Sequence, residues 1–107
     1  MVDRVKHGTY RMSGESPQEV ALKVYGDRSR YHILLKYNDD WDTEDTIVVP
    51  NKEGRTTLVS EGDTLTTLIE RMFPGQLAHL YTSKYDTWNA SAPVEELVGK
   101  LVFIPER

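Results

Sequence analysis

The chain has 107 residues and a net charge of −4 at pH 7, with 38% hydrophobic and 28% charged residues. This composition is typical of a soluble globular protein, and the length allows one ordinary domain or two very small ones. The lack of cysteine excludes disulfides and cysteine-ligated metal. Residues 1–54 hold 8 basic and 10 acidic side chains, and residues 55–107 hold 5 and 7. We therefore expect no nucleic-acid partner, and no apolar run is long enough to predict a membrane span.

The first elements expected are a short strand and a helix. Thr9–Met12 alternates in the manner of a strand. Ser16 is a good N-cap, Pro17 suits the first helical position, and Glu19 completes a capping box. Gly26 can end this helix in a left-handed conformation.

A second helix and a second strand follow in the first half. The apolar spacing predicts a helix over Ser29–Tyr37 that stops at Asn38. The acidic stretch Asp39–Asp45 is expected to be a loop. The β-branched run Thr46–Val49 predicts a strand that ends at Pro50.

The second half repeats this order. Thr56–Val59 predicts a strand, and Thr64 is the expected N-cap of the next helix. That helix has the clearest apolar stripe in the chain: Leu65, Leu68, Ile69 and Met72. The sequence Phe73-Pro74-Gly75 closes it.

The last part of the chain completes the second copy. Leu77, Leu80 and Tyr81 predict one more short helix, residues 86–95 a loop, and Leu101–Ile104 a strand. The repeat of about fifty residues divides the chain into modules 1–54 and 55–107. The expected class is α+β: two tandem β-α-α-β modules, each a two-stranded sheet with two helices on one face.

The order and spacing of these signals resemble the lysin motif (LysM), a family with a β-α-α-β fold. The second copy matches at residues 59–65 and 98–105, and the first at residues 24–31. The first copy departs from the family at Gly14-Glu15-Ser16-Pro17, where Gly-Asp-Thr-Leu is usual. The second copy has Lys84 where the family often has Asn.

One implication of the resemblance is a structural role. The run Tyr25-Gly26-Asp27-Arg28-Ser29-Arg30-Tyr31 is similar to LysM domains of phage tails and contractile injection machines. Small LysM proteins there bridge the tail tube or hub to the surrounding baseplate or sheath. The resemblance implies a non-enzymatic adaptor that contacts other tail or baseplate proteins, present in several copies. Its location would be the virion, after assembly in the host cytoplasm.

The alternative is a peptidoglycan- or chitin-binding module. Glycan-binding LysM domains hold N-acetylglucosamine between the loop after the first strand and the loop before the last. Both interpretations point to the same loops. The candidate partner- or glycan-binding residues are Gly14, Glu15, Ser16 and Trp41 in the first copy and Gly62, Asp63, Thr64, Leu65 and Trp88 in the second. The two tryptophans are expected in equivalent loops, where they could cap a core, meet a protein or stack on a sugar.

No catalytic, cofactor or metal site is expected. The acidic run does not fit a calcium loop, because counting from Asp40 puts Asp45 and Asn51 where Gly and Glu are needed. His7, His32 and His79 lack the spacing of metal ligands. An activated nucleophile needs a base and an orienting group, and each serine or threonine candidate already has an expected role as a cap or in a strand.

Overall fold

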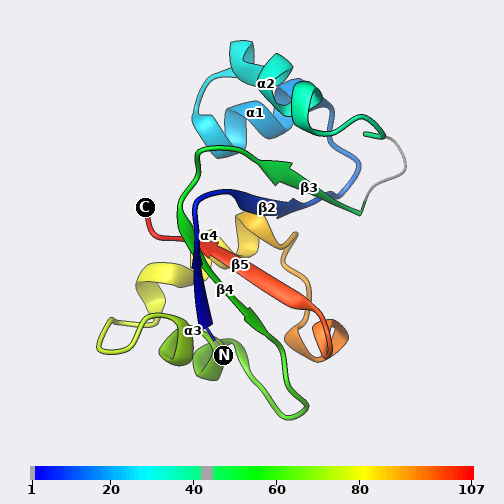
Figure 1. Cartoon of the computed structure of the whole chain (residues 1–107). Helices are drawn as coiled ribbons and strands as arrows, with labels where there is room; N and C mark the ends of the chain where they lie inside the picture. Colours follow the sequence, from blue (N-terminus) through cyan, green and yellow to red (C-terminus); the bar gives the residue numbers. More distant parts are fainter. Residues whose placement is uncertain (1, 42–44) are drawn as a thin grey trace.

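Strands and helices follow the same order in both halves of the chain (Figure 1). The computed structural model describes residues 2–41 and 45–107, so Asp42, Thr43 and Glu44 of the expected acidic loop lie outside the described residues. The first half contains β2 (Gly8–Arg11), α1 (Pro17–Tyr25), a 3₁₀ turn (Arg28–Arg30), α2 (Tyr31–Tyr37) and β3 (Thr46–Val49). The second half contains β4 (Gly54–Leu58), α3 (Leu65–Met72), α4 (His79–Trp88), a 3₁₀ turn (Val94–Leu97) and β5 (Leu101–Pro105). The α+β class is confirmed.

An additional strand, β1 (Val2–Val5), opens the chain and was not expected. It pairs antiparallel with β4, which also pairs antiparallel with β5. The second half therefore has a three-stranded sheet in the order β1-β4-β5, while β2 and β3 form a two-stranded sheet. A two-stranded sheet was predicted for the second half, and this is wrong because its third strand comes from the other end of the chain. Asp3 and Arg4 are exposed, so β1 lacks the apolar alternation that identifies a strand in a sequence.

Two antiparallel strand pairs, β1 with β4 and β2 with β3, follow each other as one β-ribbon with a single interruption, and this ribbon runs through both halves. Residues 2–11 pair with residues 46–57, but the pairing is interrupted by a bulge. In this bulge, Lys6 and His7 of one strand lie opposite the four residues 50–53 of the other. At this bulge Asn51 is left-handed, with φ 61°, and its N–H donates to His7 Nδ1 at 3.0 Å. The dark-blue and green strands of Figure 1 follow this ribbon from one half to the other. The halves are therefore joined at two points along the chain, not by one linker.

The buried side chains form two clusters. The second cluster lies on one face of the three-stranded sheet, under α3 and α4: Val59, Leu68, Ile69, Met72, Phe73, Tyr85, Val94, Leu97, Val102 and Ile104. The first cluster lies under α1 and α2: Tyr10, Val20, Ala21, Val24, Leu34, Ile47, Val49, Trp88 and Phe103. In each half, both helices thus pack with the strands around one cluster. Two members of the first cluster, Trp88 and Phe103, come from the second half of the chain.

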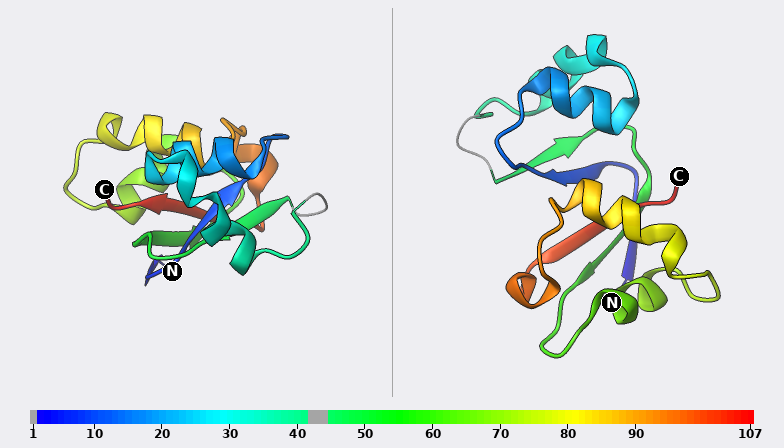
Figure 2. Two further views of the ribbon diagram at one scale, coloured as in Figure 1. Left: turned by 90° about the horizontal axis from the view of Figure 1, so that it is seen from above. Right: turned by 180° about the vertical axis from the view of Figure 1, so that it is seen from behind.

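Helix α4 differs most from its prediction. It was expected to be short and to bury Leu77 and Leu80, but these are 61% and 52% exposed. The helix instead extends to Trp88 and buries Tyr85 and Trp88, with Tyr81 packed against the second cluster. These three residues have the i, i+4, i+7 spacing of one helical face. The view from behind shows α4 crossing the middle of the molecule (Figure 2), where it contacts both β5 and β2.

Candidate functional site

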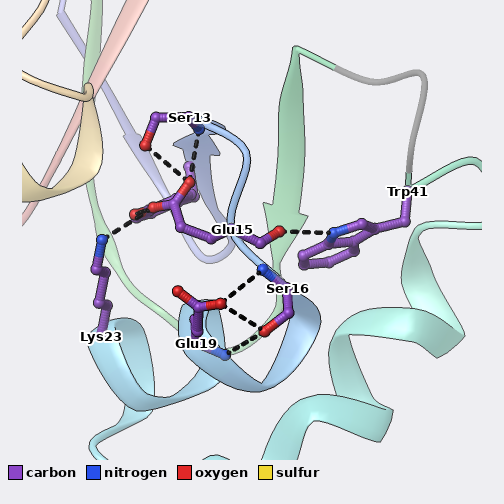
Figure 3. A network of polar contacts seen from close by, with 7 residues as sticks. Ser13, Glu15, Ser16, Glu19, Lys23 and Trp41 are labelled. Atoms are coloured by element: carbon purple, nitrogen blue, oxygen red, sulfur yellow. Dashed lines mark hydrogen bonds and ion pairs between the residues drawn. The ribbon is translucent and has the colours of Figure 1, made fainter.

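The loop between β2 and α1 carries three of the predicted site residues (Figure 3). Gly14 has a left-handed φ of 86°, which turns the chain into the helix. Ser16 is the N-cap of α1: its hydroxyl accepts from Glu19 N at 3.2 Å, and Glu19 Oε1 accepts from Ser16 N at 3.4 Å. The predicted capping box is therefore confirmed, and it fixes the direction in which the loop leaves the helix.

Glu15 points inward from this loop and accepts four hydrogen bonds. Ser13 donates from its backbone at 2.6 Å and from its hydroxyl at 2.9 Å, and Lys23 Nζ donates at 3.0 Å. The fourth donor is the Tyr10 hydroxyl in the first cluster. Burial by itself raises the pKa of Glu15, but these hydrogen bonds outweigh it and lower the pKa to about 2. Burial, reinforced by the Glu15 carboxylate, raises the pKa of Tyr10 well above its usual value.

Trp41 closes the same loop from the other side. Its indole Nε1 donates to the Glu15 carbonyl at 3.2 Å, and its ring packs against the first cluster (Figure 3). The four site residues predicted in the first copy are thus brought together. The half-buried indole therefore bonds directly to the loop that carries the other three residues.

The loop between β4 and α3 is built in a similar way. Gly62 has a φ of 89°, and Thr64 is the N-cap of α3, reciprocated by Thr67. Asp63 receives both Arg71 guanidinium nitrogens, at 2.8 and 3.1 Å. It also accepts from Ser60 N at 2.9 Å. Arg71 is the main reason that the pKa of Asp63 lies well below its usual range. Leu65 is half-buried against the second cluster.

The two loops correspond residue by residue at a spacing of 48. Gly14-Glu15-Ser16 matches Gly62-Asp63-Thr64, and in each copy the carboxylate pairs with a cation eight residues later, Lys23 or Arg71. The buried residues of the helices match at the same spacing: Val20 with Leu68, Ala21 with Ile69, and Val24 with Met72. The internal repeat therefore extends to side-chain geometry. Sequence reasoning missed both cations, although their shared spacing from the carboxylate was a readable signal.

An asparagine in each copy ties the second helix to the last strand. Asn38 ends α2, donates to Val48 O and accepts from Val48 N, both at 2.8 Å. Asn89 ends α4 and donates to Phe103 O at 3.1 Å. Lys84 was expected at the position of this asparagine, but α4 is three residues longer than α2, so Asn89 has the role instead.

Trp88 does not lie in the loop where it was expected. It is the last residue of α4, only 4% exposed, with its ring against Tyr10 and Phe103 at centroid distances of 6.0 and 5.2 Å. Trp88 therefore does not join Gly62, Asp63, Thr64 and Leu65 in a surface site. Its burial removes it from the surfaces that could stack on a sugar, and makes it a contact between the halves.

The grooves near these residues are open and polar. A cavity of about 310 Å³ lies between the halves, lined by Tyr10, Ser13, Glu15 and Lys23 on one side and by Asp86, Thr87, Ala90 and Ser91 on the other. In residues 2–41 and 45–107, no group of three or more His, Asp or Glu side chains is placed to hold a metal ion. Because Glu15 and Asp63 are already occupied by hydrogen-bond donors, each serves to anchor its loop.

Comparison of the chain with protein-family models, with curated proteins and with solved structures gave no significant match. Within the described residues, no helix has the length and apolarity needed to cross a membrane.

Proposed function

We propose that the chain is a non-enzymatic structural adaptor made of two tandem LysM-like modules. Its neighbours are the hub or tube and the baseplate or sheath proteins of a phage tail or contractile injection machine. It acts in several copies within the virion, after assembly in the host cytoplasm. This proposal rests on the resemblance of residues 24–31 to LysM domains of such machines.

The observation that supports this function best is the interlocking of the halves. Trp88 and Phe103 of the second half complete the first cluster, and both strands of the β-ribbon cross between the halves. A protein that holds two neighbours in fixed geometry needs such rigidity, since free rotation about a linker would not define their spacing. The loops of the candidate site are likewise filled by their own side chains and present fixed surfaces.

The test is association of the tagged chain with assembled particles. The full chain is expressed with an affinity tag in a host that produces the tail or injection machine, and the particles are purified by sedimentation. We expect the chain to sediment with the particles and to give density in a reconstruction. Particles that assemble fully without this chain contradict the proposal.

Peptidoglycan or chitin binding is the second candidate, favoured by the loop Gly62-Asp63-Thr64-Leu65, which matches the glycan-binding members of the family. Its test is sedimentation with purified peptidoglycan. Binding that chito-oligosaccharide displaces, and that Thr64→Ala weakens more than the matched change Ser16→Ala, supports this candidate over the adaptor.

A further inference from the structure

The charged side chains are unevenly distributed over the surface, although the two halves of the chain have the same excess of acidic over basic residues. Six basic side chains gather where the ribbon crosses between the halves and the C-terminal residues meet it: Arg4, Lys6, Lys52, Arg55, Lys84 and Arg107. Two acidic side chains, Glu53 and Glu106, lie among them. We call this surface the basic groove. Its side chains sum to +4 in a chain whose side chains sum to −4, which leaves −8 for the side chains of the remaining residues.

The basic groove is a concave region of the surface. A cavity of about 470 Å³ is lined by Arg4, Asn51, Lys52, Glu53, Glu106 and Arg107. Two smaller depressions continue it and share Glu106, one past Arg55 and Tyr81 and one past Val5 and Lys6. The backbone beneath is fixed, because Glu106 N donates to Glu53 O at 3.1 Å. In Figure 1 the C-terminus lies beside the strands at this crossing.

Glu106 shows how the groove holds a carboxylate. Arg4 Nε and one terminal nitrogen donate to its two oxygens at 3.2 and 3.4 Å, and Arg55 Nε lies 3.6 Å from one of them. A planar guanidinium fork matches a carboxylate in this bidentate way. The Glu106 carboxylate alone does not neutralise the positive charge of the groove, however. Among the described residues, no ion pair or hydrogen bond is recorded for the side chains of Lys6, Lys52 or Arg107, all of which line it.

Two of these cations, Lys52 and Lys84, lie close enough to repel each other. Lys84 Nζ donates to Glu106 O at 3.2 Å, and Lys52 is close enough to lower the pKa of Lys84 in addition to the effect of burial. An incoming anion would relieve this repulsion.

We propose that the basic groove docks a short acidic segment of a partner protein, one that carries spaced Asp or Glu side chains. The inference rests on the proposed adaptor function, because it names the chemistry of one neighbour. Long nucleic acid fits less well, since Glu53 and Glu106 interrupt the cations and the charge of −8 on the other residues repels a polyanion beyond the groove. The docked segment contacts both halves, because residues of β1, of the bulge and of the C-terminus all line its site.

The test is direct binding to the full chain. The probe is a fluorescent eight-residue peptide that alternates glutamate with serine, and its partner probe has glutamine in place of glutamate. Fluorescence anisotropy at low salt should show binding of the glutamate probe only, and salt should weaken it because exposed charges are screened. No binding of the glutamate probe overturns the inference, while the adaptor function is judged separately by sedimentation with particles.

Two double variants with equal charge changes localise the site. Lys52→Glu/Arg107→Glu alters the groove. Arg28→Glu/Lys100→Glu alters two exposed residues elsewhere, one in the first 3₁₀ turn and one immediately before β5. The variants are compared at about 0.1 M salt, where screening confines charge effects to about 10 Å. We expect the first to weaken probe binding at least about fivefold and the second to change it less than about twofold. Equal weakening by both variants overturns the inference, as does tighter binding of a single-stranded oligonucleotide of the same charge.

Discussion

At the scale of single residues, the two halves fix the loop before their first helix with different side chains. Each loop before a first helix must satisfy a backbone N–H and hold its turn against the helix. The first copy uses Glu15 with Lys23, and the second uses Asp63 with Arg71. The longer Glu15 side chain also reaches the Tyr10 hydroxyl in the first cluster, whereas Asp63 stays near the surface. Glu15 therefore couples its loop to the core, and it is the stronger candidate for a measurable contribution to stability.

The lowered pKa of Glu15 predicts a pH-dependent loss of stability. Its pKa falls from 4.5 to about 2 on folding, so its contribution is complete above pH 4.5 and is lost as the pH falls toward 2. The side chain is only 6% exposed, and a shift of this size is worth about 3 kcal/mol. We expect Glu15→Gln to remove part of the decrease in thermal stability between pH 5 and 2.5, measured by circular dichroism, while Asp63, whose pKa is also lowered, accounts for a further part.

Glu19→Gln is the matched control, because it removes the same charge four residues later, in the first turn of α1, and keeps the capping-box acceptor. This variant should retain the acid sensitivity of the unmodified chain. If Glu15→Gln and the unmodified chain lose stability in parallel over this pH range, Glu15 is not the group responsible.

Gly54 is required by close packing at the point where the ribbon passes β5. A Cβ atom there would lie 2.5 Å from Ile104 O and 2.6 Å from the Phe103 ring. The backbone oxygen cannot move away without breaking the pairing of β4 with β5. We expect Gly54→Ala to destabilise the chain by more than about 2 kcal/mol in urea unfolding, in the range of overpacked sites. Gly14→Ala, at a left-handed residue with open space, should cost only about 1 kcal/mol.

At the scale of elements, the first helix of each half and strands β2 to β5 could be predicted, because their signals are local. The capping box at Ser16, the N-cap Thr64 and the stripe Leu68-Ile69-Met72 depend only on neighbours in sequence, and all are confirmed. Helix α4 could not be predicted as well. Its buried face is defined by Tyr85 and Trp88, and Trp88 packs in a cluster formed mostly by residues far away in the sequence. Strand β1 was missed for the same reason, since only its pairing with β4 makes it a strand.

The same distinction applies to the candidate site. The loops at Glu15 and Asp63 could be located from Gly-acid-hydroxyl motifs, because these determine a local turn. The positions of the tryptophans depend on tertiary packing, which brings the Trp41 indole within hydrogen-bond distance of the Glu15 carbonyl and buries Trp88. The basic groove could not be predicted from the sequence either. Its cations are spread from residue 4 to residue 107, and the net charge of each half does not show that they meet in space.

Trp88 should be the most important contact of α4. Removing its buried ring leaves Tyr10 and Phe103 facing a cavity, so we expect Trp88→Ala to destabilise the chain by about 3–5 kcal/mol. Trp41→Ala removes the same side chain from a half-buried position and should cost clearly less. Urea unfolding followed by circular dichroism compares the two variants. Equal losses would mean that Trp88 does not hold the halves together.

At the scale of the whole molecule, the halves share one body. The radius of gyration is 13.5 Å, close to the value of about 13 Å for a compact domain of this length. Each cluster alone is small, and small cores give marginal stability. The shared residues Trp88 and Phe103, together with the ribbon, supply contacts that separate modules would lack. Unfolding is therefore expected to be a single transition in which neither half persists without the other.

This coupling can be tested because both tryptophans report on the same cluster. Trp88 belongs to the first cluster and Trp41 packs against it, so tryptophan fluorescence follows the first cluster, to which both halves contribute. Leu68 lies in the second cluster and is fully buried, and Leu68→Ala should cost about 2–5 kcal/mol. If the halves unfold together, this variant lowers the urea midpoint seen by fluorescence as much as the midpoint seen by far-ultraviolet circular dichroism. Leu34→Ala in the first cluster should do the same. A fluorescence midpoint that Leu68→Ala leaves unchanged would mean that the halves are independent, and a rigid adaptor would then have to gain its fixed geometry from its partners.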